Sequence, residues 1–284
     1  MKKCDAVLVC TMVFGLAAFA LADESADKLL NDSKVAARAG NLERAVKLAS
    51  QAVEQQPDDA RLRYYRGTLY EARRQHKEAV SDFTRSIELT PRDADADAYD
   101  HRGSERLALG EFDDAIADFD RAIALDPRRE PGHWKRGIAY YYAGRYDDGR
   151  KQFEGYQTVD GNDVENAVWR FLCMARQDGV EAARRELLNI KHDRRVPMME
   201  VYALFAGKAK PDDVVTAARA GDPTADDLLH RLFYTELYLA LYAEATDDLA
   251  AVRPHLQAAV DRKIAHFMWD VARMHLDLIE QPRP

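Results

Sequence analysis

The chain has 284 residues, of which 47% are hydrophobic and 32% charged, and its formal net charge is −8. The hydrophobic share is large enough to build a packed core, which excludes a disordered chain. Because no basic stripe with interleaved aromatic residues occurs, we also expect no binding to nucleic acid.

The first 22 residues have the order of features found in secretory signal peptides. Lys2-Lys3 gives a positive start, residues 6–22 are uncharged and rich in Val, Leu, Phe and Ala, and the small residues Ala20 and Ala22 precede Asp23. We therefore predict a cleaved signal over 1–22 and an exported protein that is periplasmic or secreted. The alternative is an uncleaved membrane anchor, for which the apolar stretch is at the short limit.

The cysteines indicate neither a lipid anchor nor a disulfide. Val7-Leu8-Val9 precedes Cys10 where a lipidation signal needs small residues, so membrane attachment by lipidation is not supported. Cleavage leaves Cys173 alone, and one cysteine cannot form an internal disulfide. Its apolar setting, AVWRFLCMAR, predicts a buried and unreactive thiol. The alternative is an enzyme that uses Cys173, or a carboxylate cluster assembled by the fold.

A repeat of 34 to 36 residues organises the middle of the chain. Arg-Gly pairs open three copies, at Gly67, Gly103 and Gly137, and the first two copies share an Ala, a Phe and a Pro at matching positions. The spacing of apolar residues within each copy predicts two helices separated by a turn, with Gly110 and Gly144 at the turn. One such hairpin cannot cover its own apolar face, so the copies are expected to stack into a solenoid.

This pattern resembles the tetratricopeptide repeat (TPR) family, which implies an all-α solenoid of helical hairpins wound into a right-handed superhelix. We assign three repeats to 60–163 and a degenerate copy, with Ser33 at the glycine position, to 23–59. Residues 164–284 are expected to add more helices, including a TPR-like hairpin with Ala240 at the glycine position and a closing helix. The helices expected here are Asp163–Arg176, Gly179–Ile190, Met198–Gly207, Pro211–Gly221, Tyr234–Ala245, Asp248–Val260 and Ile264–Ile279.

The third repeat opens with an aromatic-rich segment, WKRGIAYYYAGRY. Its residues at i, i+4, i+7 and i+8 are Trp134, Ile138, Tyr141 and Tyr142, which lie on one face of a helix and form the aromatic stripe. The resemblance implies that this stripe, with the matching positions of the earlier repeats, faces the concave groove and binds a protein or peptide. Exposed Trp and Tyr favour such contacts. The alternative is that the C-terminal helices cover the stripe. The expected binding residues are Tyr64, Asp100, Ser104, Trp134, Ile138, Tyr141 and Tyr142.

The sequence contains no recognisable metal, cofactor or catalytic motif. Asp93, Asp95 and Asp97 resemble the start of a calcium loop, but Ala98 and Ser104 stand where such a loop needs Gly and Glu. The histidines lack zinc-ligand spacing, and no Gly-rich phosphate loop or G-x-S-x-G occurs. We therefore expect no catalytic residues, no metal and no cofactor.

An arginine precedes the glycine of each repeat, as Arg66, Arg102 and Arg136. The planar guanidinium fork is suited to carboxylates on neighbouring helices. We therefore predict that these arginines form ion pairs along the solenoid, and a binding site for a ligand carboxylate is the alternative.

A longer segment, His133–Arg176, is similar to the new-lipoprotein-I family of bacterial cell-envelope proteins. Arg136–Tyr142 matches that family's Arg-Gly-Ile-Ala-Tyr-Tyr helix, Asn162-Asp163 its turn and Trp169 its next helix, and Thr235–Tyr242 resembles its late repeat. The resemblance implies a helical adaptor, often dimeric, that docks peptidoglycan hydrolases and a tail-specific protease. That family is lipid-anchored, and this chain departs from it because it lacks a convincing lipidation site.

Together these features predict a non-enzymatic scaffold of the bacterial cell envelope that recognises a protein or peptide through its TPR surface. The repeat, the signal and the missing catalytic motifs all favour this function. The alternatives are a structural homo-oligomer without a peptide ligand, and an enzyme whose site is assembled only by the fold.

Overall fold

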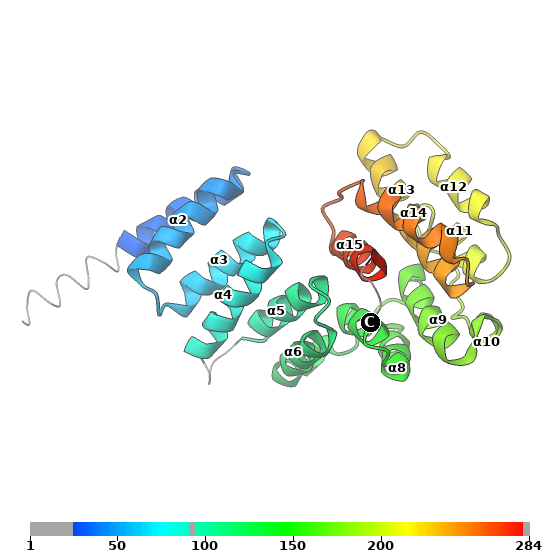
Figure 1. Cartoon of the computed structure of the whole chain (residues 1–284), viewed down its shortest axis with the longest axis horizontal. Coiled ribbons are helices and arrows are strands. Elements are labelled where there is room, and N and C mark those ends of the chain that lie inside the picture. Colours follow the sequence, from blue (N-terminus) through cyan, green and yellow to red (C-terminus); the bar gives the residue numbers. More distant parts are fainter. Residues whose placement is uncertain (1–24, 91–94, 281–284) are drawn as a thin grey trace, which may run out of the picture. The chain divides into compact units, whose positions relative to one another are not determined.

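The computed structural model describes residues 25–90 and 95–280, and the prediction of an all-α chain is confirmed for them (Figure 1). The predicted signal at 1–22 and Asp93 of the aspartate triplet lie outside the described residues. No described helix is both long enough and apolar enough to cross a membrane. The helices are residues 25–38, α2 (Leu42–Gln55), α3 (Ala60–Ala72), α4 (His76–Leu89), α5 (Ala96–Ala108), α6 (Phe112–Leu125), the short 3-10 helix η1 (Pro127–Arg129), α7 (Trp134–Tyr142), α8 (Tyr146–Tyr156), α9 (Val164–Asp178), α10 (Val180–Arg185), α11 (Met198–Phe205), α12 (Pro211–Arg219), α13 (Ala225–Ala245), α14 (Leu249–Val260) and α15 (Phe267–Glu280).

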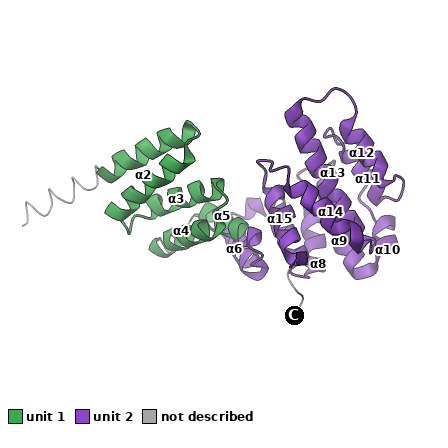
Figure 2. Cartoon of the chain, turned by 45° about the horizontal axis from the view of Figure 1, so that its top comes forward, with its two compact units in different colours: residues 1–105 green, residues 106–284 purple. Residues whose placement is uncertain are grey.

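The chain forms two compact units whose boundary falls inside α5, between Glu105 and Arg106 (Figure 2). In unit 1, residues 25–38 pack on α2 through small side chains, and α3 packs on α4. In unit 2, consecutive helices pair as α7 with α8, α9 with α10, α11 with α12 and α13 with α14, and α15 packs on α14. Each unit is therefore built from the helical hairpins that the repeat predicts.

Close approach of the two helices explains why the repeat carries Gly and Phe sixteen positions apart. A Cβ atom added to Gly67 would lie 2.8 Å from the ring of Phe83, and one added to Gly137 would lie 2.5 Å from the ring of Phe153. Both rings are buried. Any larger residue at the glycine position would displace its phenylalanine, so the hairpin geometry depends on this pair.

The turns within the hairpins need a left-handed backbone conformation. Gly110 and Gly144 have φ angles of 79° and 73°, so the prediction that they mark the turns is confirmed. Glycine adopts this conformation without the steric penalty of a Cβ atom. In the first complete repeat, Arg74 holds the same position with φ of 54°. The turn therefore tolerates a non-glycine residue, at a conformational cost.

The C-terminal helices were predicted in the right order, but three of their boundaries differ by three residues or more. α10 ends at Arg185, five residues before the expected end, and no helix occupies the following residues up to Pro197. α13 starts at Ala225 instead of Tyr234, because Thr224 caps it by accepting a hydrogen bond from the backbone nitrogen of Asp227 at 3.2 Å. α15 starts at Phe267 instead of Ile264.

Arg66 and Arg136 form ties of the predicted kind between neighbouring helices. Arg66 donates to both carboxylate oxygens of Asp82, at 2.6 and 2.8 Å. Arg136 donates to Asp120 and to Gln152, each at 2.8 Å. At the third position, Arg102 donates to the hydroxyl of Thr84 at 3.2 Å. The guanidinium forks of Arg66 and Arg136 thus hold hairpins together, as the ion-pair prediction states.

Candidate functional site

Part of the aromatic stripe of α7 (Trp134, Ile138, Tyr141 and Tyr142) is buried in the core of unit 2. Ile138 is fully buried and Tyr141 is 5% exposed, so the prediction of an open stripe is wrong for these two residues. Tyr141 packs against Trp169 of α9 at 5.5 Å between ring centroids, so at this position the alternative, in which helices of the C-terminal region cover the stripe, holds. The physical reason is that α7, α9 and α15 all contribute apolar side chains to one core, and packing these side chains together removes them from water.

A chain of polar contacts also joins α15 to α7. The hydroxyl of Tyr142 lies 3.1 Å from Nδ1 of His275, and Nε2 of His275 lies 3.4 Å from Glu244 on α13. Arg176 donates to Glu244 at 2.7 Å and to the hydroxyl of Tyr141 at 3.3 Å. Burial by itself would raise the pKa of Glu244, but the neighbouring His275 and Arg176 hold it below its usual value. The aromatic stripe is therefore fixed by specific partners as well as by apolar packing.

The expected binding residues of unit 1 differ in accessibility. Ser104 is 1% exposed and donates its hydroxyl hydrogen to the carbonyl of Asp100 at 2.8 Å, so its predicted place in an open groove is wrong. The backbone bond within its own helix satisfies the hydroxyl and allows its burial. Asp100 and Tyr64 are partly exposed, and the Tyr64 ring packs against Phe83. Burial and nearby carboxylates, Asp97 first among them, raise the pKa of Tyr64 to about 12.

Trp134, at the start of α7, remains partly exposed and borders a cavity of about 180 Å³ in unit 2. Its ring lies edge-on to Phe267, the first residue of α15, at 5.9 Å and nearly parallel to His266, the residue before that helix, at 6.5 Å between ring centroids. The cavity combines aromatic walls with charged groups. It is lined by Trp134, Phe153, Tyr156, Asp163, Glu165, Asn166, Trp169, Arg195, His266 and Met268.

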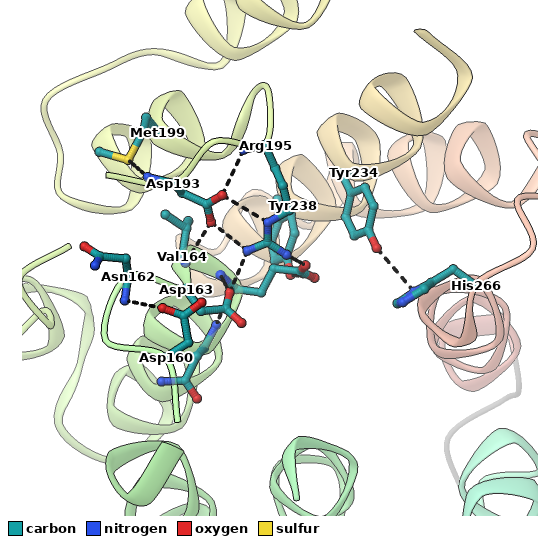
Figure 3. A network of polar contacts seen from close by, with 12 residues as sticks. Asp160, Asn162, Asp163, Val164, Asp193, Arg195, Met199, Tyr234, Tyr238 and His266 are labelled. Carbon is teal, nitrogen blue, oxygen red and sulfur yellow. Dashed lines mark hydrogen bonds and ion pairs between the residues drawn. The ribbon is translucent and has the colours of Figure 1, made fainter. Parts of the chain in front are cut away.

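Arg195 contributes a charged group to the lining of this cavity, and Figure 3 shows it beside its partners Asp163 and Asp193. It comes from the segment between α10 and α11 and pairs with three carboxylates, at 2.7 Å to Asp163, 2.5 Å to Glu165 and 2.6 Å to Asp193. Asp163 also caps α9, since its Oδ1 accepts from the backbone nitrogen of Glu165 at 2.9 Å. The loop before α11 is thus anchored to the start of α9 by one guanidinium.

Glu165 is the most perturbed carboxylate of the cavity. Its second oxygen accepts a hydrogen bond at 2.7 Å from the hydroxyl of Tyr238, a fully buried side chain. Burial raises the pKa of Glu165 to about 6, although Arg195 and the Tyr238 hydroxyl act in the opposite direction. Glu165 is therefore mainly ionised at pH 7 but takes up a proton in mildly acidic solution.

Cys173 has none of the features of a catalytic thiol. It is fully buried, so the prediction of a buried cysteine is confirmed. Burial raises its pKa to about 12, whereas a nucleophilic cysteine needs a lowered pKa and access to substrate. Its sulfur packs against α8, where a Cβ atom on Gly149 would approach it to 2.8 Å. Cys173 therefore fills the space between α8 and α9.

Sequence reasoning placed Trp134 in the site but missed its charged members. Arg195, Asp193 and His266 come from loops and from the start of a helix, far along the chain from Trp134. The signal that was available is the Asn-Asp turn before α9, which places Asp163 at an N-cap. Nothing in that local pattern indicates that residues 30 positions later fold back onto it.

The arrangement of paired helices around a shared core defines a helical-repeat solenoid. Comparison with known families identifies the repeats as tetratricopeptide repeats, since a "Tetratricopeptide repeat" family matches residues 32–94 and a "TPR repeat" family matches residues 103–144. The chain therefore contains TPRs in both units, as the sequence pattern predicts.

Solved structures support the same fold at low sequence identity. A TPR protein from Parabacteroides merdae aligns with a TM-score of 0.59 and 15% identity over 91% of this chain and 100% of its own. MamA from Desulfovibrio magneticus aligns with a TM-score of 0.52 and 18% sequence identity, over 57% of this chain and 90% of its own. YrrB, described as a TPR protein with an unusual peptide-binding site, aligns with a TM-score of 0.53 and 19% sequence identity. The alignment covers 67% of this chain and 93% of YrrB. At these identities the likeness concerns the fold alone.

Proposed function

We propose that this protein is a non-enzymatic scaffold that binds a protein or peptide at the cavity beside Trp134. The observation that carries the proposal is that α7 and α9, the first helices of successive hairpins, both line the cavity, together with α8, α15 and the segment before α11. First helices line the concave face of a TPR solenoid, and extended concave faces are what solenoids use for binding. The peptide-binding site named for the TPR protein YrrB agrees with this function.

The shape of unit 2 favours recognition of a short segment over a whole helix. Ile138 and Tyr141 are buried in the core of unit 2, so they are unavailable to a partner. The remaining access is at Trp134 and Tyr156, which are both partly exposed. Aromatic side chains at the centre of a contact region contribute much of the binding energy in protein interfaces.

We further propose that the protein acts in the bacterial cell envelope after export. The support is the signal pattern over 1–22 and the resemblance of His133–Arg176 to the new-lipoprotein-I family. By that resemblance the partner is a peptidoglycan hydrolase or an envelope protease, and the protein is a homodimer. Mass spectrometry of the protein from its native host tests export, because cleavage gives a mature chain that begins at Asp23.

Site-specific photo-crosslinking tests the binding site directly. A photoreactive residue at Tyr156 should capture a partner in cells, and the same residue at Leu249, which is 64% exposed on α14, is the matched surface control. Trp134→Ala should abolish the Tyr156 product while circular dichroism stays unchanged. Capture of a second copy of the chain would instead support the homo-oligomer, and capture from Leu249 alone would place recognition elsewhere.

A further inference from the structure

The walls of the cavity beside Trp134 are suited to a positively charged group. Trp134, Phe153, Tyr156 and Trp169 all contribute rings. An aromatic face attracts cations through its quadrupole, most strongly when the group is shielded from water. An internal example lies at the rim, where the ammonium of Lys135 is 4.7 Å from the ring centroid of Phe267.

The charge balance around the cavity is negative. Among the charged groups that line the cavity, Asp163 and Glu165 stand against Arg195, a net of −1; Asp193 pairs with Arg195, Lys135 lies at the rim, and Arg194 lines the neighbouring cavity. Partial burial, followed by the nearby Lys135, lowers the pKa of His266, so this ring adds no charge at neutral pH. Arg231 of the neighbouring cavity is paired with Asp227 at 2.6 Å.

Arg195 is poorly placed to hold an anion, because its own carboxylates already use it. Its Nε, Nη1 and Nη2 atoms all donate to Asp163, Glu165 or Asp193, at 2.5 to 3.0 Å. A guanidinium has five N–H groups in a fixed fork, so little donor capacity is left for a ligand. The negative balance and the occupied fork therefore both disfavour a carboxylate or phosphate.

The floor of the cavity offers an acceptor for a donor-rich ligand. Asn166 is 4% exposed, and its amide nitrogen donates to the carbonyl of Phe153 at 2.9 Å. This leaves its Oδ1 without a hydrogen-bond partner among the described residues. The indole nitrogen of Trp169 likewise lacks an acceptor within the described part of the chain, and a peptide carbonyl would supply one. A ligand that forms hydrogen bonds with such buried groups stabilises the complex, because these groups otherwise lack a partner.

The size of the cavity limits what can enter. A cavity of about 150 Å³ holds a molecule the size of benzene. The volume of about 180 Å³ therefore suits one side chain and excludes a helix. Resting on the proposed binding function, we propose that the cavity receives a single arginine or lysine side chain of the partner, with its charge among the rings and next to Asp163 and Glu165.

The test uses residues 23–284 and capped pentapeptides, Gly-Gly-Xaa-Gly-Gly, in which Xaa is Arg, Lys, Gln or Glu. Binding is followed by NMR of the tryptophan indole resonances at low and high salt. We expect the Arg and Lys peptides to bind at least tenfold more tightly than the Gln peptide, and the difference to shrink in high salt. Equal binding of the Gln peptide, or tighter binding of the Glu peptide, would overturn the proposal.

Variants locate the effect without relying on one that fails to fold. Glu165→Gln removes a cavity charge while keeping the side chain's shape, and Asp212→Asn makes the same charge change on an exposed part of α12. Glu165→Gln should lower the affinity for the Arg peptide at least fivefold, and Asp212→Asn should leave that affinity unchanged. Equal effects would show that only overall charge matters. If crosslinking from Tyr156 finds a partner while all four peptides fail to bind, the cation proposal fails and the binding function stands.

Discussion

Replacing Gly137 by alanine tests whether the repeat glycine is needed for close helix approach. The new Cβ atom would lie 2.5, 2.8 and 2.9 Å from three carbons of the Phe153 ring, whereas unstrained carbon contacts are about 3.5–4.0 Å. The ring would have to move by about 1 Å. Phe153 is 1% exposed and stacks at 6.5 Å on Trp169, so such a movement disturbs the core. Overpacking of this kind costs about 1–3 kcal/mol.

Gly155→Ala is the matched control for this substitution. Gly155 lies in α8, and a Cβ atom added there meets no heavy atom within 4 Å. Both variants gain up to about 1 kcal/mol from the higher helix propensity of alanine. Their difference therefore isolates the steric cost, and Gly137→Ala should be less stable than Gly155→Ala by about 1–3 kcal/mol.

Urea unfolding followed by tryptophan fluorescence measures this difference in unit 2 alone, because all three tryptophans (Trp134, Trp169 and Trp269) lie there. Adding Phe153→Leu to Gly137→Ala should recover part of the lost stability. The reasoning is refuted if Gly137→Ala unfolds at the same urea concentration as Gly155→Ala.

Three further predictions concern single side chains. Folding raises the pKa of Glu165 from 4.5 to about 6, so the folded state binds this proton more tightly than the unfolded state. The free energy of unfolding should therefore fall by about 2 kcal/mol as the pH rises from 4.5 to 6. Glu165→Gln should remove that part of the pH profile of stability, and an unchanged profile would contradict the shift. Gly144→Ala should lower the free energy of unfolding, measured with urea, by about 1 kcal/mol, because φ of +73° is unfavourable for a residue with a Cβ atom. No neighbour lies within 4 Å of the new atom, so the loss would come from the backbone conformation alone. An unchanged stability would mean that the turn relaxes. Alkylation of Cys173 should be on the order of 100-fold slower in the native protein than in urea, and equal rates would show that its burial is transient.

The hairpin fold was predictable because its determinants repeat along the chain. Gly67 and Gly137 each stand sixteen residues before a buried phenylalanine, and both pairs make the close contact that the repeat requires. Turn positions such as Gly110 also follow from local sequence, since φ is positive there. Where the repeat fades, boundaries were less accurate, as at the start of α13, whose Thr224 cap was overlooked.

The candidate site was only partly predictable. Helical spacing correctly grouped Trp134, Ile138, Tyr141 and Tyr142 on one stripe, but the same spacing describes a core stripe and a binding stripe equally well. Which of the two it becomes depends on whether another helix covers it. Here Tyr141 packs against Trp169 of α9, Ile138 is buried in the same core, and Trp134 stays partly exposed beside Phe267 of α15.

By itself, the sequence of this protein determined the helices, their pairing and the glycine–phenylalanine contacts, because these depend on residues within one repeat. The tertiary structure alone decided which rings are accessible and brought Arg195 to Asp163 and Glu165, across about thirty residues of chain. Contacts of this kind are made between elements whose apolar faces can pack in several ways. Which packing forms depends on the apolar surface buried by the whole unit, so it cannot be predicted from a local sequence pattern.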